Sequence, residues 1–217
     1  MPHYAKKTLD LYFDYRFGEG ELCSISDRGN YDLTQHGQHS REFLGVKENN
    51  QKIIPEVIEI SFGVERLMLA ILEDSYQEEE VENSRSSSQE KRQVLKIPPL
   101  LAPYFVTVIP LMAKKEHREK IKNRAQEVYS ELLKFGNFSV SYEEGDIGRS
   151  YRRQDTIGTY YCLTVDSLTV NEYAPDGKSN PHYNTITLRH RDTMKQEEKR
   201  ISINNIKNYL YSLYEKK

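Results

Sequence analysis

Three polar side chains stand at a junction between a strand and a helix where a packed core would need none of them. The stretch PEVIEISFGVERLMLAILEDSY, residues 55–76, carries Glu59 and Ser61 in an apolar strand pattern, and Arg66 in the first turn of the following helix. Because side chains alternate along a strand, Glu59 and Ser61 share one face of the sheet. A carboxylate suits an ammonium group, and a guanidinium suits phosphate. The junction therefore predicts a site for a small charged molecule.

The stretch GEGELCSISDRGNYDL offers a second carboxylate, Glu21, in a strand whose alternation would put Glu21 with Cys23 and Ile25. Two glutamates on neighbouring strands repel each other unless a cation lies between them, and a bound amino group would meet that need. The alternative is that Glu21 is a solvent-facing glutamate on an edge strand and Arg66 an ordinary solvated helical arginine.

The elements that must position these groups form a first, incomplete unit. We expect strands at LDLYFDYRFG, at GELCSISDRGNYDL and at IIPEVIEIS, a loop at TQHGQHSREFLGVKENNQK, and a helix from Gly63. A helical period in the last segment predicts a face that packs on the sheet, made of Val64, Leu67, Met68, Ile71 and Leu72. Three strands and one helix make a poor independent domain.

A second unit alternates strand and helix patterns. We expect strands at residues 104–111, 138–142, 160–165 and 183–190, and helices at 116–135, between Gly145 and Gly158, and in the tail INNIKNYLYSLYEKK. This alternation predicts a mixed sheet with helices packed on it. Between the units, QEEEVENSRSSSQEKRQ has one apolar residue in its whole length, which is typical of a mobile linker or surface insertion.

The composition limits the classes of protein that fit. The 217 residues are 37% hydrophobic and 29% charged, with 16 Tyr available for a core, so a folded protein is expected. No apolar run is long enough to span a membrane. Cys23 and Cys162 lack the spacing of metal ligands, which favours reduced thiols in a cytoplasmic protein. The charge is acidic in the first half and mildly basic in the second, which permits a polyanionic partner.

An ordered set of motifs resembles one family. VIEISFGVERLMLAIL is similar to the third signature motif of class II aminoacyl-tRNA synthetases, and ELCSISDRGNYDLTQH with PEVIEISFGVER resembles the dimeric, α2-type glycyl-tRNA synthetases. LKIPPLLAPYFVTVIPL, GDIGRSYRRQDTIGTYYCLTVD and ITLRHRDTMKQ resemble that family's anticodon-binding domain. The resemblance runs from His3 to near the C-terminus and skips only the linker. It implies part of the class II catalytic domain at 1–76, a linker at 77–96 and an α/β anticodon-binding domain at 97–217.

The resemblance also implies roles for single residues. Arg66 matches the arginine that contacts the phosphates of ATP, and it is the residue we expect to be catalytic. Glu59 and Glu21 match the carboxylates that hold the ammonium group of glycine, and Glu59 also lies at the ATP site. Ser61 matches the hydroxyl that helps to reject larger side chains. Glycine offers only its two ends to grip, so steric exclusion and charge pairing must supply its selection.

The second unit is expected to read the unstacked bases of the anticodon loop by stacking and edge hydrogen bonds. The candidate tRNA-binding residues are Arg149, Tyr151, Arg152, Arg153, Arg189 and Arg191. The alternative is that the arginines are ordinary cations paired with local acids such as Asp155 and Asp192.

This sequence departs from the family pattern in several places. Ile60 stands where proline is usual, and Cys23-Ser24 replaces a stretch that normally includes glycine. The first and second signature motifs, the latter with an arginine that grips ATP and the amino-acid carboxylate, have no counterpart. We therefore expect the C-terminal portion of a longer enzyme, inactive and monomeric on its own, and a homodimer when complete.

In such enzymes the glycine carboxylate attacks the α-phosphate of ATP, helped by Mg²⁺, and the tRNA then takes the glycyl group. No further metal site is expected. Two rivals stay open. One is a non-enzymatic nucleic-acid-binding accessory protein on the same scaffold, and the other is a sister synthetase for threonine, proline or histidine. Retention of the charged junction argues against the first, and a pocket walled by a serine and two glutamates fits glycine better than a larger amino acid.

Overall fold

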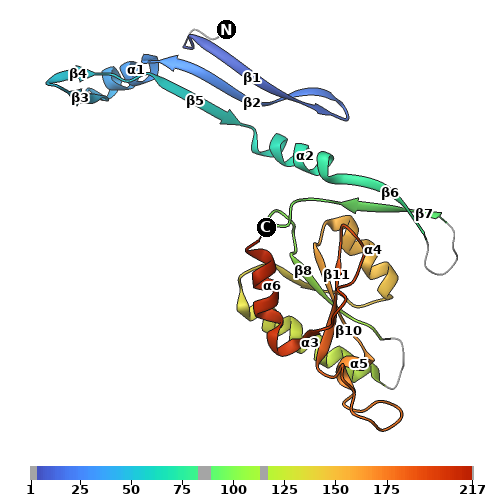
Figure 1. Cartoon of the computed structure of the whole chain (residues 1–217). Coiled ribbons are helices and arrows are strands. Elements are labelled where there is room, and N and C mark those ends of the chain that lie inside the picture. Colours follow the sequence, from blue (N-terminus) through green and yellow to red (C-terminus); the bar gives the residue numbers. More distant parts are fainter. Residues whose placement is uncertain (1–3, 83–88, 113–116, 217) are drawn as a thin grey trace. The chain divides into compact units, whose positions relative to one another are not determined.

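The computed structural model describes residues 4–82, 89–112 and 117–216 of the chain (Figure 1). It divides into two compact units, Met1–Asp74 and Ser75–Lys217. Within the described ranges no helix is long and apolar enough to cross a membrane. The predicted helix start at Glu116, the beginning of the family resemblance at His3 and the serine run of the predicted linker lie outside the described residues.

The first unit is built on an antiparallel sheet of three strands in the order β1-β2-β5. These strands are β1 (Lys7–Tyr15), β2 (Gly18–Gly29) and β5 (Val57–Phe62), and helix α2 (Val64–Ser75) follows β5 almost directly. The three predicted strands and the predicted helix are present, although further elements lie between β2 and β5. The side chain of Tyr15 is buried and donates a hydrogen bond from its hydroxyl to the backbone oxygen of Arg66 at 3.0 Å, which ties β1 to α2.

The region predicted to be a loop has regular structure instead. It contains helix α1 (Tyr31–Ser40) and the short hairpin of β3 (Val46–Glu48) and β4 (Gln51–Ile53). The residues NYDL, predicted to end a strand, lie at the start of α1, where Arg28 and Asp32 form an ion pair with a nitrogen–oxygen distance of 2.6 Å. The hairpin turns at Asn49 and Asn50, both with positive φ, as a tight two-residue turn requires.

The predicted packing face of α2 is wrong in this structure. Val64 and Met68 are 65% and 58% exposed, and Leu67 and Leu72 are also exposed. On β5, Ile58 and Ile60 are similarly exposed, whereas only Ala70 of the helix is recorded as a buried apolar residue. The 3.6-residue period correctly predicted an apolar face, but the strands of this unit do not cover it.

The second unit has a mixed sheet of five strands in the order β12-β11-β10-β8-β9. The strands are β8 (Val106–Pro110), β9 (Val140–Tyr142), β10 (Tyr161–Val165), β11 (Thr185–His190) and β12 (Ile201–Ser202). Strand β8 runs parallel to both β9 and β10, whereas β10–β11 and β11–β12 are antiparallel. The predicted mixed α/β fold is confirmed.

Helices lie on both faces of this sheet. They are α3 (Arg118–Phe135), α4 (Ile147–Ile157), α5 (Ser167–Val170), the 3-10 turn η2 (Ile203–Asn205) and α6 (Ile206–Tyr214). One continuous core joins α3 and α6 to the side chains of Val106, Val108 and Leu163. Thr164 alternates with Leu163 and therefore faces the other way, where its hydroxyl bonds that of Tyr151 on α4 at 2.7 Å.

The segment predicted to be a linker or insertion contains two paired strands. They are β6 (Tyr76–Glu82) and β7 (Gln89–Leu95), which pair antiparallel from Tyr76↔Leu95 to Glu82↔Gln89 (Figure 1). Arg92 and Val94 of β7 are buried, at 1% and 0% exposure. The composition misled here because a charged residue, Arg92, fills an interior position that is normally apolar.

Candidate functional site

In the first unit, a bulge decides which residues share the polar face of the sheet. Strand pairing sets Ser26 opposite Glu59 and Ser24 opposite Ser61. Between β1 and β2, Leu11 pairs with Cys23 but Tyr12 pairs with Glu21, so Leu22 is an extra residue. Such a bulge moves the next side chain to the other face. The register thus places Glu21 on the face of Glu59 and Ser61, whereas simple alternation would have put it with Cys23.

Glu59 and Ser61 lie together, and a cation already holds Glu59. The hydroxyl of Ser61 is 3.4 Å from Oε1 of Glu59, and Nη1 of Arg28 is 2.8 Å from Oε2. The Arg28 guanidinium also bonds Asp32 and stacks over the ring of Tyr4, 4.0 Å from its centroid. The hydrogen bond from Arg28 lowers the pKa of the Asp32 carboxyl below its ordinary value. The carboxyl group of Glu59 thus lies between the hydroxyl of Ser61 and the guanidinium of Arg28.

Arg66 does not meet the Glu21 carboxylate. Its Nη1 donates to the backbone oxygen of Glu21 at 2.6 Å, and the residue is exposed. The structure therefore brings Arg66 and Glu21 together through the main chain, at the end of the sheet where β2 extends beyond its pairing with β5. Of the departures from the family pattern, Ile60 lies exposed on the apolar face, and Cys23 is buried.

In the second unit, α4 forms one wall of an open groove of about 1230 Å³. Asp146 caps the helix by accepting a hydrogen bond from the backbone nitrogen of Arg149 at 3.2 Å, and Gly158 ends it with a φ of 86°. The helical residues that line the groove include Ile147, Gly148, Arg149, Tyr151, Arg152 and Arg153. Four of the six predicted tRNA-binding residues therefore lie on one wall.

The four residues differ in whether their side chains already form hydrogen bonds or ion pairs within the protein. In the part of the chain that the structure describes, Arg149 is exposed and its side chain has no recorded hydrogen bond or ion pair. Arg153 pairs with Glu143, with 2.5 Å between Nε and Oε1, and Arg152 pairs with Glu90. Burial raises the pKa of Tyr151, so its hydroxyl stays protonated beside Thr164. The wall thus offers one unengaged cation and two cations that share carboxylates.

The other two predicted tRNA-binding residues are inside the domain. Arg189 is 5% exposed and makes a two-bond pair with Asp155 at 2.8 and 2.9 Å. Arg191 is 2% exposed, pairs with Asp192, and donates to the backbone oxygens of Ile97 and Gly158. The pairing alternative holds for both arginines, although in the interior rather than at the surface. Arg189 nevertheless lines the groove, whereas Arg191 is not among its lining residues.

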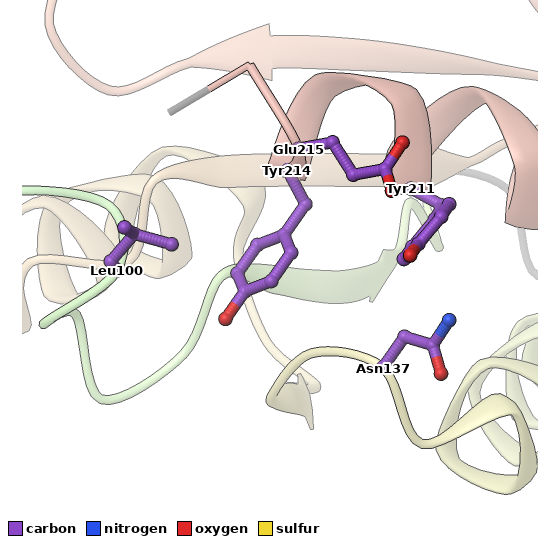
Figure 2. A pocket seen from close by; sticks show the side chains of 5 residues that line it. All are labelled: Leu100, Asn137, Tyr211, Tyr214 and Glu215. Atoms are coloured by element: carbon purple, nitrogen blue, oxygen red, sulfur yellow. The ribbon is translucent and has the colours of Figure 1, made fainter.

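A second hollow lies at the end of α6 (Figure 2), and its volume of about 410 Å³ is smaller than that of the groove. It is lined by Leu100, Asn137, Tyr211, Tyr214 and Glu215. Its charged lining residue is an acid, and a hydrogen bond to Glu215 raises the pKa of Tyr211. Among the described residues that line this hollow there is no cation for a phosphate chain, so the groove beside α4 is the stronger candidate for a nucleic-acid site.

Sequence reasoning missed the second wall of the groove. It comes from β6 and β7, the segment predicted to be a linker, and it contributes Glu78, Glu82, Glu90, Lys91 and Gln93. In the structure Lys91 and Gln93 are exposed while Arg92 and Val94 are buried. Because Arg92 is charged, this alternation is not visible as an alternation of apolar and polar residues in the sequence.

Comparison with known proteins starts with this second unit. Residues 106–213 match the family model described as "Anticodon binding domain". The fold resembles the solved structure "Giardia lamblia Prolyl-tRNA synthetase in complex with prolyl-adenylate", with a TM-score of 0.60. That likeness has 16% sequence identity and covers 94% of this chain and 36% of the other, so it bears on the fold alone.

The curated relatives give a more specific indication than the family model does. The chain is 44% identical over 213 residues to "Glycine--tRNA ligase" of Mycoplasmopsis synoviae (strain 53), covering 97% of this chain and 42% of the relative. It is 41% identical over 213 residues to the protein of the same name from Clostridium tetani (strain Massachusetts / E88), covering 97% and 40%. The chain thus spans about two fifths of the length of these relatives.

Proposed function

We propose that this chain is part of a glycine–tRNA ligase, in which the second unit recognises the anticodon of glycine tRNA. The groove beside α4 carries this proposal, because it gathers Arg149, Tyr151, Arg152 and Arg153 within the region that matches the anticodon-binding model. An open groove with cations on an aromatic-bearing helix suits single-stranded RNA, whose phosphates need charge and whose splayed bases need edges to bind. The identity with glycine–tRNA ligases supports glycine as the amino acid.

The first unit contributes part of the glycine and ATP pocket in this proposal. Glu59 and Glu21 receive the ammonium group of glycine, and Ser61 narrows the space beside it. Arg66 contacts the phosphates of ATP as the carboxylate oxygen of glycine attacks the α-phosphorus and pyrophosphate leaves. The shared polar face of Glu21, Glu59 and Ser61 supports these roles. Mg²⁺ would accompany ATP, and the complete enzyme would be a cytoplasmic homodimer.

The accessory-protein alternative gains no support from the geometry. A protein that only binds nucleic acid has no use for a bulge that turns Glu21 toward Glu59 and Ser61. Nor does it need a carboxylate, Glu59, placed beside a hydroxyl on that face. These features favour a ligase pocket.

A binding titration tests the anticodon proposal. The chain is titrated with a glycine tRNA transcript and with transcripts changed at the second or third anticodon base, at two salt concentrations. We expect the native anticodon to bind at least about tenfold more tightly, which is about 1.4 kcal/mol. Arg149→Ala should weaken binding, whereas Arg118→Ala, an exposed arginine on α3 outside the groove, should not. Equal affinity for all transcripts, lost with rising salt, would mean phosphate attraction only and would overturn the proposal.

A further inference from the structure

The β6–β7 hairpin lies outside the region that matches the anticodon-binding model, yet it forms one side of the groove. Its residues Glu78, Glu82, Glu90, Lys91 and Gln93 line the groove opposite α4. A wall can contribute to recognition only if its position is fixed, because a loosely attached segment would lose binding energy to its own ordering. The first question is therefore what holds the hairpin.

Ion pairs and hydrogen bonds of the buried Arg92 side chain fix the hairpin to the rest of the second unit. Arg92 is 1% exposed, and its Nε lies 2.9 Å from Oδ2 of Asp155 on α4. Its other nitrogens bond Glu79 on β6 and the backbone oxygen of Arg191. Since Arg189 shares the Asp155 carboxylate, one buried acid connects β7, α4 and β11.

Close packing adds to this attachment at the end of α4. A Cβ on Gly158 would lie 2.8 Å from Cγ2 of Ile97 and 3.2 Å from the backbone oxygen of Leu95. The hydroxyl of Thr156 lies 3.4 Å from the backbone oxygen of Gln93. The C-terminal end of α4 and the end of β7 are thus in direct contact.

Besides the buried pair of Arg92 and Asp155, a partly exposed pair of opposite charges joins the two walls. Glu90 on β7 pairs with Arg152 on α4, and their side chains are 35% and 36% exposed. Nη1 of Arg152 also lies 3.8 Å from the sulfur of Met194. A carboxylate beside a guanidinium presents an acceptor next to donors, which complements a base edge that carries an amino group next to ring acceptors. Cytosine has that edge, with a donor at N4 and acceptors at N3 and O2, and carboxylates are known to accept from its N4 amino group.

Lys91 follows Glu90 in β7 and also lines the groove, with its side chain exposed to solvent. Its side chain is 78% exposed, and its recorded ion pair, with Glu78, is long at 3.9 Å. A lysine so placed can exchange a weak surface pair for an RNA phosphate at little cost.

We propose that the β6–β7 hairpin is part of the RNA site, in which Glu90 with Arg152 reads a cytosine of the anticodon and Lys91 contacts a phosphate of the same strand. This inference rests on the proposed function and adds a specificity-determining residue, Glu90, to it. Glycine codons begin with two guanines, so the anticodon that pairs with them has cytosine at its second and third positions.

The test uses the full chain, with two hairpin variants and two matched controls. Glu90→Ala is compared with Glu144→Ala, which breaks a pair with Lys122 in which both side chains are 36% exposed. Lys91→Ala is compared with Lys178→Ala, an 84% exposed lysine 3.3 Å from Asp176. Each protein is titrated with a glycine tRNA transcript and with transcripts that carry uracil in place of cytosine at the second or third anticodon position. Thermal unfolding confirms that each variant is folded.

The two hairpin variants should change tRNA binding in different ways. Glu90→Ala should reduce the preference for cytosine over uracil at one position from about tenfold to below about threefold, because the acceptor for N4 is lost. Total affinity can stay high, since Arg152 becomes free to bind phosphate. Lys91→Ala should weaken binding to all transcripts alike and lower the salt slope by about 0.7, as loss of one phosphate contact to a single strand requires. Even if Glu90→Ala failed to fold, Lys91→Ala would still test the site.

The outcomes separate this inference from the proposed function. If the unmodified chain prefers cytosine and Arg149→Ala weakens binding, but both hairpin variants behave like their controls, the hairpin inference is overturned and the anticodon proposal stands. If the unmodified chain shows no preference among the transcripts, the anticodon proposal itself is overturned, and the hairpin inference with it.

Discussion

The two units place apolar side chains in opposite ways. In the second unit, Val108, Leu163 and Leu188 are 0% exposed and belong to one continuous core. In the first, Ile58, Ile60 and Met68 are more than half exposed, although their spacing is as regular. Regular spacing therefore predicts that an element has an apolar face, but it does not predict that the same unit covers that face. The first unit relies on strand pairing and ion pairs, whereas the second has a hydrophobic interior.

The largest expected loss of stability follows from removing a buried charge in the second unit. Asp155→Asn leaves Arg92 and Arg189 buried without a full counter-charge, which should lower the free energy of unfolding by about 3–5 kcal/mol. Hydrogen exchange followed by mass spectrometry can report each unit separately. The matched change in the first unit, Asp32→Asn, should affect protection much less because its pair with Arg28 is more exposed. Similar losses from both variants would remove the contrast between the units.

The next largest loss of stability is expected at a buried apolar position, which we compare with an exposed one. Leu163→Ala creates a cavity in the core and should lower the free energy of unfolding by about 2–5 kcal/mol, measured by urea denaturation followed by circular dichroism. Ile58→Ala, at a position that is 62% exposed, should change it by less than about 0.5 kcal/mol. A large loss from Ile58→Ala would show that the exposed face is covered in solution.

A third effect concerns pH. Asp166 caps α5 and pairs with Arg200 at 2.8 Å, and although burial opposes ionisation, these bonds hold the pKa of its carboxyl below the ordinary value. Because the folded pKa is lowered, this contribution is complete above the unfolded pKa of about 3.9 and is lost as the pH falls through the folded value. Asp166→Asn should cost about 1.5–3 kcal/mol at pH 7. It should also flatten the stability profile of the second unit between about pH 5 and pH 2. An unchanged profile would mean that other carboxyl groups dominate acid unfolding.

The smallest expected effect is at the candidate glycine site. Glu59 is 45% exposed, so Glu59→Gln should change the free energy of unfolding by less than about 0.5 kcal/mol, even though it removes a pair with Arg28. Such a result in a urea titration would mark Glu59 as a residue kept for binding rather than for stability. A loss above about 1 kcal/mol would instead make the pair a structural feature of the first unit.

The sequence predicted the second unit well because its signals are strong and local. Apolar, β-branched strands and a helical period that stops at Gly136 leave little choice of structure. The sequence could not show that Glu21 turns to the face of Glu59, because a bulge at Leu22 depends on how two strands pair. Nor could it separate Arg149 from Arg189, since both read as cations near a turn and only the tertiary structure buries the second. The hairpin was missed because charge at Arg92 takes the place of the apolar side chain that marks an interior strand.

The bond from Arg92 to the backbone oxygen of Arg191 joins positions 99 residues apart in the chain. A ribosome adds about 5–20 residues per second, so roughly 5–20 seconds separate the synthesis of these two partners. Its partner on α4, Asp155, is made 63 residues after Arg92, so until then the newly made Arg92 has no partner from α4 or β11 and must stay hydrated. Abundant polar side chains in the hairpin suit this waiting period, because a segment rich in Glu and Gln stays soluble while the rest of its binding surface is still being made.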